Sequence, residues 1–210
     1  MSIKNRTYSL FDTRKMMRNV AKKIVNDSNC RIVYPVGNCS SGIFFIGEAP
    51  GAKEDEIGEP FVGASGRILN NILLPSVGLN RDTIYLTNIV KCRPPNNRDP
   101  LPSEKKAWSD VLTAEILAVK PRLLVCLGRH SLGFFFPTAK ISKTHGTVEY
   151  TEISKDQKLP VLALYHPAVG LYNPKSKEIL KKDFLVIKRY LDRYENDSSD
   201  EKNTIQTELI

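Results

Sequence analysis

The sequence predicts an α/β fold, a three-layer sandwich in which a central, mainly parallel sheet of four strands is flanked by helices. Two observations predict it. Short, β-rich apolar runs alternate with longer stretches whose apolar residues recur at helical spacing. The chain of 210 residues is also long enough for one substantial core, and two full domains of ordinary size are not expected.

The strands are expected where the chain is apolar throughout and is followed by turn residues or a polar segment. In open α/β sheets, ligands bind beyond the carboxyl ends of the strands, so the residues after each run are the first candidates for a site. The four expected strands are 42–47, 84–90, 123–127 and 160–165.

Helices are expected between and around these strands, each with one apolar face. They cover 65 or 66 to 77, 103–119, a short segment from Arg129, 176–194 and, at the N-terminus, 12–26. The N-terminal helix, 12–26, carries the apolar stripe Met16, Val20 and Ile24. The helix 176–194 carries the apolar stripe Leu180, Phe184, Ile187 and Leu191.

We expect one domain over residues 1–194, within which residues 1–30 form a basic, helical N-terminal extension. The segment 195–210 contains few apolar side chains that could be buried; after Glu195 it reads NDSSDEKNTIQTELI. It is therefore expected to be a disordered tail.

The composition favours a soluble protein with a polyanionic partner. Thirty-one Lys and Arg against 23 Asp and Glu give a net charge of +8, although a basic surface is also compatible with simple solvation. No secretory signal or membrane-length apolar run is present, so we expect a cytoplasmic (nucleoid-associated) or nuclear protein that is neither secreted nor membrane-bound.

The four cysteines include no Cys-x2-Cys pair, and disulfides are not expected.

The first candidate motif follows the first strand and runs over residues 47–66. Its small residues and prolines let the backbone turn tightly around a ligand. Glu48, at the strand exit, can hold a water molecule, and Phe61 can offer a flat face to a base. The alternative is a structural loop in which Phe61 only caps the core.

The second motif, residues 87–98, follows the second strand. Asn88 carries a hydrogen-bond donor and an acceptor together, as reading an amide-imide edge requires, although buried asparagines more often satisfy neighbouring backbone. Behind it, the rigid, Pro-rich loop with Arg93, Asn97 and Arg98 could follow a phosphate backbone.

The third motif is Tyr165-His166-Pro167-Ala168, after the fourth strand. A histidine at such a strand end can donate a hydrogen bond to an oxygen that gains charge in a transition state. The other two histidines, His130 and His145, are interpreted as ordinary polar residues with satisfied partners.

Together the motifs GEAPG, KED, GEPFVGASG, TNIVKCRPPNNR and YHPA resemble the uracil-DNA glycosylase superfamily, and family 4 most closely. The resemblance runs in order from about Arg31 to Leu191. It implies an enzyme that flips uracil out of DNA and hydrolyses its N-glycosidic bond, leaving an abasic site for base excision repair. That chemistry needs no nucleophilic side chain of the protein, no metal and no nucleotide cofactor, because water is the attacking group.

The resemblance also implies residue roles. Phe61 would stack on the uracil, Asn88 would read its polar edge, and His166 would stabilise negative charge at uracil O2. Glu48 would orient the attacking water or stabilise the oxocarbenium-like sugar. The base pocket would be completed by Gly47, Ala49 and Glu54.

Two of the pocket positions differ from family 1. Ala49 stands where family 1 has a catalytic aspartate, so Glu48 must take a larger share of the chemistry. Gly51 replaces an aromatic residue that family 1 uses against thymine, which leaves Glu54 as the candidate for excluding the 5-methyl group.

The implied partner is uracil-containing DNA, bound by a monomer. Arg93, Asn97, Arg98 and Pro167 are the candidate DNA contacts. Leu171 is the apolar residue best suited to enter the vacated base stack from the minor groove, although it could equally belong to the core.

Family 4 enzymes typically hold a [4Fe-4S] cluster through four cysteines, and most of these positions are not cysteine here. Cys92 matches the third ligand, but the fourth position is Trp108, and Val20 and Lys23 stand near the first two. No cluster and no other metal site are expected, although a set that recruits the remaining cysteines is an alternative. These are Cys30, Cys39 and Cys126.

A replacement for the cluster is visible in the sequence. Trp108 begins an apolar helical stripe, so its indole is expected to fill the volume that a cluster would occupy. The stripe continues through Val111, Leu112, Ile116 and Val119.

Two other functional interpretations remain open at this point. The chain could be a catalytically weak or inactive DNA-binding or damage-sensing subunit, but simple DNA binding does not require Glu48, Asn88 and His166 together. It could also prefer another damaged or mismatched base. A covalent adduct with the abasic product is not expected, because the loop 91–95 has no histidine.

Overall fold

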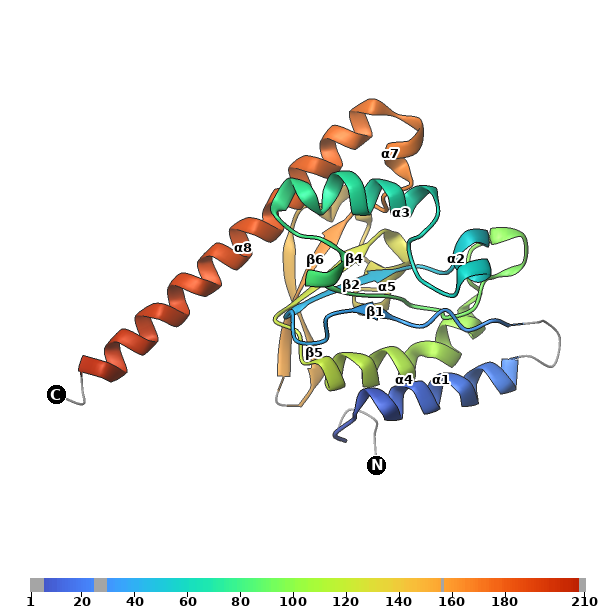
Figure 1. Ribbon diagram of the computed structural model, residues 1–210, viewed down its shortest axis with the longest axis horizontal. Helices are drawn as coiled ribbons and strands as arrows, with labels where there is room; N and C mark the ends of the chain where they lie inside the picture. The colour runs from blue at the N-terminus through green and yellow to red at the C-terminus, as the bar shows by residue number, and fades with distance from the viewer. Residues whose placement is uncertain (1–5, 25–29, 156, 208–210) are drawn as a thin grey trace.

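The structure is a computed structural model that describes residues 6–24, 30–155 and 157–207; the side chains of residues 24 and 194–207 are not described. The described chain forms one six-stranded sheet of order β1-β3-β2-β4-β6-β5 (Figure 1). Its strands are β1 (Val36–Gly37), β2 (Ile43–Gly47), β3 (Tyr85–Asn88), β4 (Leu123–Leu127), β5 (Val148–Ser154) and β6 (Gln157–Leu164).

The four central strands, β3, β2, β4 and β6, are parallel and correspond to the four strands expected from the sequence. The expectation of four strands was nevertheless too low, because β1 and β5 add an antiparallel edge on each side. Strand β1 has only two residues, and most of β5 is partly or fully exposed. Neither edge strand therefore shows the continuous apolar run of a buried strand.

Helices cover both faces of the sheet, which confirms the three-layer α/β architecture (Figure 1). They are α1 (Leu10–Ile24), α2 (Ala52–Ile57), α3 (Ala64–Ile68), α4 (Pro102–Val119), α5 (Arg129–Phe135), α6 (Ile141–Thr144), α7 (Val169–Tyr172) and α8 (Pro174–Thr207). The helix expected over 65 or 66 to 77 is divided into α3, a π-helical segment Leu69–Leu73 and a 3-10 turn Pro75–Val77.

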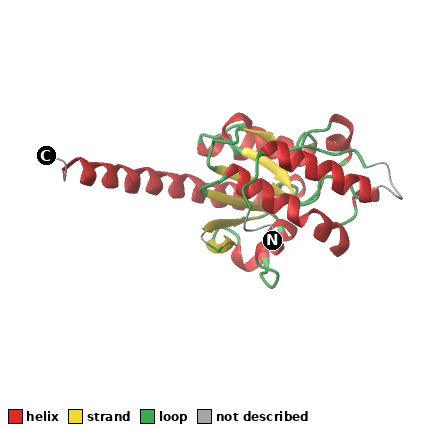
Figure 2. Cartoon of the chain, turned by 90° about the horizontal axis from the view of Figure 1, so that it is seen from below, coloured by secondary structure: helices red, strands yellow, loops and turns green. Residues whose placement is uncertain are grey.

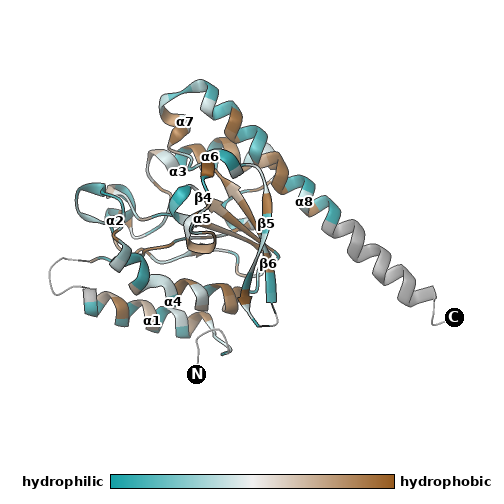
Figure 3. Cartoon of the chain, turned by 180° about the vertical axis from the view of Figure 1, so that it is seen from behind, coloured by the Kyte–Doolittle hydropathy of each residue, from teal (hydrophilic) through white to brown (hydrophobic). Residues whose placement is uncertain are grey.

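Alternating side chains of the buried strands supply two separate cores. Phe44 points into one core with residues of α1 and α4, whereas its neighbour Phe45 points into the other with residues of α3 and α8. This alternation follows from the two-residue period of a strand. Figure 3 shows the apolar strands at the centre and mixed polar and apolar faces on α1 and α4.

Helix α1, the expected N-terminal helix, packs on α4 (Figure 1). Its buried side chains are Thr13, Met17 and Ala21. Met16 and Val20 of the expected stripe are partly buried and pack against the same core, so the buried face of α1 is centred one residue further along than expected.

Helix α8 continues to Thr207 and leaves the body of the domain (Figure 2). The helix was expected to end near residue 194, before a disordered tail. No glycine or proline follows Pro174, so the sequence contains no strong signal that ends the helix. The last three residues of the expected tail lie outside the described residues.

None of the helices in the described ranges combines the length and the apolar character that a membrane crossing requires.

Candidate active site

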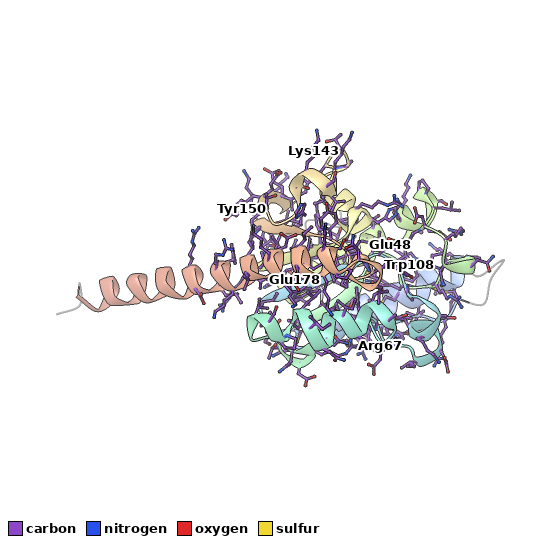
Figure 4. All side chains as sticks on the ribbon, turned by 90° about the horizontal axis from the view of Figure 1, so that it is seen from above. Glu48, Arg67, Trp108, Lys143, Tyr150 and Glu178 are labelled. Carbon is purple, nitrogen blue, oxygen red and sulfur yellow. A yellow bond between two sulfur atoms is a disulfide. The ribbon has the colours of Figure 1, made fainter. Side chains whose placement is uncertain are left out.

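The carboxyl ends of the parallel strands open into a cavity of about 490 Å³. Glu48, Phe61, Asn88 and His166 all line it, although they come from three separate motifs. Figure 4 labels Glu48 within the body of the domain, away from the projecting end of α8. Ala49 and Glu54 line the same cavity, which brings the expected catalytic residues and most of the expected base-binding residues together.

Gly47, which was expected in the base pocket, does not line the cavity. It lies beside Asn88 in the β2–β3 register, where there is no space for a side chain. A Cβ atom on Gly47 would come within 2.3 Å of Asn88 Oδ1 and 2.6 Å of Phe61 Cζ. Gly47 therefore allows the side chains of Asn88 and Phe61 to approach each other.

Phe61 has a φ of +56°, a left-handed conformation that is costly for a bulky residue. The surrounding chain holds it there. The amide of Asn70 donates to the Phe61 carbonyl at 3.0 Å, and Arg81 donates to the Phe61 and Pro60 carbonyls at 3.4 and 2.6 Å. Strain of this kind persists only where the surroundings enforce it, and it is frequent at functional sites.

Glu54 organises the same loop from the other side. Its Oε1 accepts hydrogen bonds from the backbone N–H groups of Val62 and Gly63 at 3.0 and 2.7 Å. Its Oε2 lies 2.9 Å from the position that a Cβ atom on Gly51 would take. The carboxylate thus occupies the space beside Gly51 and fixes the loop that presents Phe61.

A buried polar network, which the sequence motifs did not reveal, supports Asn88 from behind. Lys91 Nζ donates to the Asn88 carbonyl at 2.7 Å, to Thr87 Oγ1 at 2.6 Å and to Glu115 Oε2 at 2.5 Å. Glu115 comes from α4, so its presence here depends on tertiary packing.

His166 is set up as a neutral hydrogen-bond donor. Burial lowers its pKa to about 4, despite the opposing effect of Glu54. The backbone N–H of Ala168 donates to His166 Nδ1 at 3.2 Å. In the neutral ring the proton is therefore on Nε2, which leaves Nε2–H to donate to another acceptor. The ring centroid lies 5.8 Å from that of Phe61.

Glu48 has charged neighbours that the sequence did not predict. Burial raises the pKa of its carboxyl group, and nearby His130 opposes that rise. His130 Nε2 lies 3.8 Å from Glu48 Oε2 and 3.3 Å from Asp99 Oδ2. The interpretation of His130 as an ordinary polar residue was therefore incomplete, because this side chain adjoins the expected catalytic carboxylate.

The loop of the second motif contains two left-handed asparagines, Asn96 and Asn97. Asn97 and Arg98 line the cavity, whereas Arg93 binds Asn97 Oδ1 through Nε at 2.8 Å. The guanidinium of Arg98 makes two 2.8 Å bonds to Glu104. Arg98 therefore anchors its own loop, a role that the expectation of DNA contact did not include.

The third motif continues into α7 at the rim of the site. Pro167 is buried and Ala168 lines the cavity. Leu171 is 39% exposed, which places it outside the core, and the adjacent Tyr172 is 88% exposed. Leu171 was expected to enter the vacated base stack, whereas Tyr172, on the same short helix, was not predicted as a DNA contact.

The cysteines do not form a four-thiolate site for an iron-sulfur cluster. Cys92 is in a disulfide with Cys30, which corrects the expectation that no disulfide forms. The separation of 62 residues between them hid this pairing, because it depends on the folded path of the chain. Cys39 is exposed and Cys126 is buried within β4. The residues present therefore do not fit the cluster.

Trp108, which the resemblance places at the fourth ligand position of the family, is 1% exposed, and this burial was expected. It lies in the same core as Val111, Leu112 and Ile116, and Cys92 packs against that core. Val119 is only partly buried. The structure thus confirms most of the apolar stripe.

Comparison with known proteins identifies the family of the chain. Residues 34–190 match the Uracil DNA glycosylase superfamily. The chain is 41% identical to a type-4 uracil-DNA glycosylase of Archaeoglobus fulgidus, over 84% of this chain and 90% of the relative. It is 42% identical to one of Saccharolobus solfataricus, over 74% of each chain, and 35% identical to one of Thermotoga maritima, over 78% of this chain and 88% of the relative. The chain therefore belongs to the uracil-DNA glycosylase superfamily, and within it to family 4.

Proposed function

We propose that this chain is a uracil-DNA glycosylase that flips uracil out of DNA and hydrolyses its N-glycosidic bond, leaving an abasic site. One observation carries the proposal. Glu48, Phe61, Asn88 and His166 line a single cavity of about 490 Å³. An aromatic face, an amide and two groups suited to acid-base or electrostatic work are what removal of a flipped base requires.

Base recognition is assigned to Phe61 and Asn88. The ring of Phe61 stacks on the flipped uracil, and the Asn88 amide pairs with uracil O4 and N3–H through one donor and one acceptor. Glu54 lies beside Gly51, on the side of the cavity where we propose that the 5-methyl group of thymine is excluded. Recognition of this kind acts on the base and not on the surrounding sequence.

Bond cleavage is assigned to His166 and Glu48. As the bond between C1′ and uracil N1 breaks, its electron pair leaves with the base, and Nε2–H of neutral His166 stabilises the negative charge at O2. Water adds to C1′, and Glu48 orients it and accepts its proton. The products are uracil and an abasic sugar.

DNA contacts are assigned to the rim of the cavity. Leu171 and its exposed neighbour Tyr172 are placed to fill the space that the flipped nucleotide vacates. Arg93 and Asn97 complete the surface on which we propose that the phosphate backbone lies. Pro167, which was also expected to contact DNA, is buried and is not part of this surface. Arg98 contributes mainly by holding the loop through Glu104.

We further propose that the enzyme works without an iron-sulfur cluster. Trp108 is buried at one ligand position of the family, Val20 and Lys23 stand near two others, and Cys92 is paired with Cys30. The apolar core around Trp108 and the disulfide would together hold the segments that a cluster holds in other members.

The proposal is tested with a labelled oligonucleotide that contains a single uracil, treated with enzyme and then with hot alkali. The wild-type protein is expected to produce strand cleavage at uracil but not at thymine. Glu48→Gln, Asn88→Ala and His166→Ala are each expected to reduce the rate by 10²-fold or more, roughly the size of general acid-base and oxyanion effects. Tight binding without an abasic product would instead favour the DNA-binding subunit.

A further inference from the structure

His130 lies against Glu48 from outside the cavity. Glu48 lines the cavity, whereas His130 and Asp99 are not among its lining residues. The His130 side chain is 14% exposed, and its Nε2 is 3.8 Å from Glu48 Oε2 and 3.3 Å from Asp99 Oδ2. A histidine held between two carboxylates beside the reacting groups can act on the reaction without contacting DNA.

We propose that His130 is a positioning residue, which lies between the Asp99 and Glu48 carboxylates and keeps Glu48 ionised and directed into the cavity. The inference rests on the proposed function, because it assigns His130 a role in the chemistry of Glu48. Nothing in the family motifs identifies this residue, since it lies at the start of α5, outside all of them.

Four charged groups face Glu48, from two helices and the loop between β3 and α4. His130 and Arg129 begin α5, Asp99 lies in that loop, and Lys105 belongs to α4. Burial raises the pKa of Glu48, His130 most strongly opposes the rise, Asp99 adds to it, and Arg129 and Lys105 lower it. Because Arg129 contacts the Asp99 carboxylate, the unfavourable effect of Asp99 on Glu48 is partly compensated.

The His130 ring also contacts Arg129. Arg129 Nε donates to His130 Nε2 at 3.1 Å, so Arg129 holds the same ring atom that lies next to the two carboxylates. The Arg129 guanidinium is a further positive charge near Glu48.

A change of charge at residue 130 should therefore move the titration of Glu48. His130→Gln keeps a polar side chain of similar reach but has no charge, so the Glu48 carboxyl is expected to titrate about one pH unit higher than in the wild-type enzyme. His130→Lys restores a positive charge and is expected to return the midpoint toward the wild-type value. A residue with only a structural role would show no such rescue.

The chain offers a matched control at its other carboxylate-bound histidine. His145 Nδ1 lies 2.7 Å from Asp183 Oδ2, and neither residue lines the cavity. His145→Gln also removes a histidine from a carboxylate pair, so a general loss of stability would appear in both variants. Only His130→Gln should alter the titration of Glu48.

The decisive experiment is a carbon-13 NMR titration of glutamate carboxyl groups, with the Glu48 signal assigned by its loss in Glu48→Gln. It is run on the wild-type protein, His130→Gln, His130→Lys and His145→Gln. A higher midpoint in His130→Gln that His130→Lys reverses supports the proposal. The same midpoint in the wild-type protein and His130→Gln overturns it, and neither result depends on catalysis.

The pH dependence of uracil excision gives a second readout. Because ionised Glu48 is the active form, the acidic limb of the kcat profile is expected to move to higher pH in His130→Gln, with KM little changed. In Glu48→Gln, adding His130→Gln should have no further effect on kcat. If the wild-type enzyme excises no uracil, the proposed function fails, and the NMR titration still decides the role of His130.

Discussion

Lys91 Nζ lies 2.5 Å from Glu115 Oε2, and both side chains are 0% exposed. This ion pair joins Lys91, three residues beyond the end of β3, to the C-terminal half of α4. Burial lowers the pKa of Lys91 and raises that of Glu115, and in each residue the charge of the partner opposes the shift. Lys91 Nζ also donates to the backbone carbonyl of Asn88, so the pair supports the strand end that carries Asn88.

Removal of one partner of this pair should be far more harmful than removal of both. Lys91→Met leaves the Glu115 carboxylate buried without a counter-ion, which typically costs about 3–5 kcal/mol of folding free energy. The double variant Lys91→Met with Glu115→Leu should recover much of that loss. Urea unfolding measures both, and equal stabilities for the single and double variants would contradict this interpretation.

Glycine 47 should be needed for function more than for folding. In Gly47→Ala, the new methyl group would lie 2.3 Å from Asn88 Oδ1, so both base-binding side chains must move. We expect uracil excision to fall by about 10²-fold, as small displacements of positioned groups can cause. Gly133→Ala is the control, since a Cβ atom there meets no atom within 4 Å and its activity should be unchanged.

The Cys30–Cys92 disulfide should stabilise the protein by restricting the unfolded chain. For a separation of 62 residues, the chain-entropy relation gives about 4 kcal/mol. Addition of dithiothreitol, or the variant Cys30→Ser, should lower the urea midpoint accordingly. A non-reduced protein mass equal to that of the fully reduced chain would show that the bond does not form.

The depressed pKa of His166 predicts a pH dependence of stability. The folded value is about 4 and the ordinary value is 6.5, so in this window the unfolded chain binds a proton that the folded chain does not. The contribution of His166 to stability should therefore decrease as the pH falls from 6.5 to 4. His166→Gln should flatten this part of the profile in urea unfolding experiments. An identical slope in the variant would contradict the assignment.

The central sheet and the main site residues could be predicted because each has a local signature. Strand β2 is apolar throughout, and Glu48, Asn88 and His166 each lie at or beyond the end of a strand. Once the strands are recognised as parallel, their carboxyl ends must converge. The position of these three residues at one sheet edge therefore does not depend on the details of side-chain packing.

The supporting residues could not be predicted in the same way, because they reach the site from distant parts of the chain. Glu115 contacts Lys91 across 24 positions, and Arg81 holds the Pro60 carbonyl across 21. His130 approaches Glu48 only because α5 begins beside the loop after β2. Strand β5 was missed for a different reason, since its mostly exposed side chains lack the apolar run that identified the central strands.

The activity and the absence of a cluster are tested together by mass spectrometry of free uracil after incubation of the purified protein with uracil-containing DNA, with iron measured on the same preparation. We expect uracil release by a protein that contains no stoichiometric iron, and loss of that release in Glu48→Gln. Absence of uracil release from folded wild-type protein would contradict the proposed activity, and release only by an iron-loaded preparation would contradict the rebuilt core around Trp108.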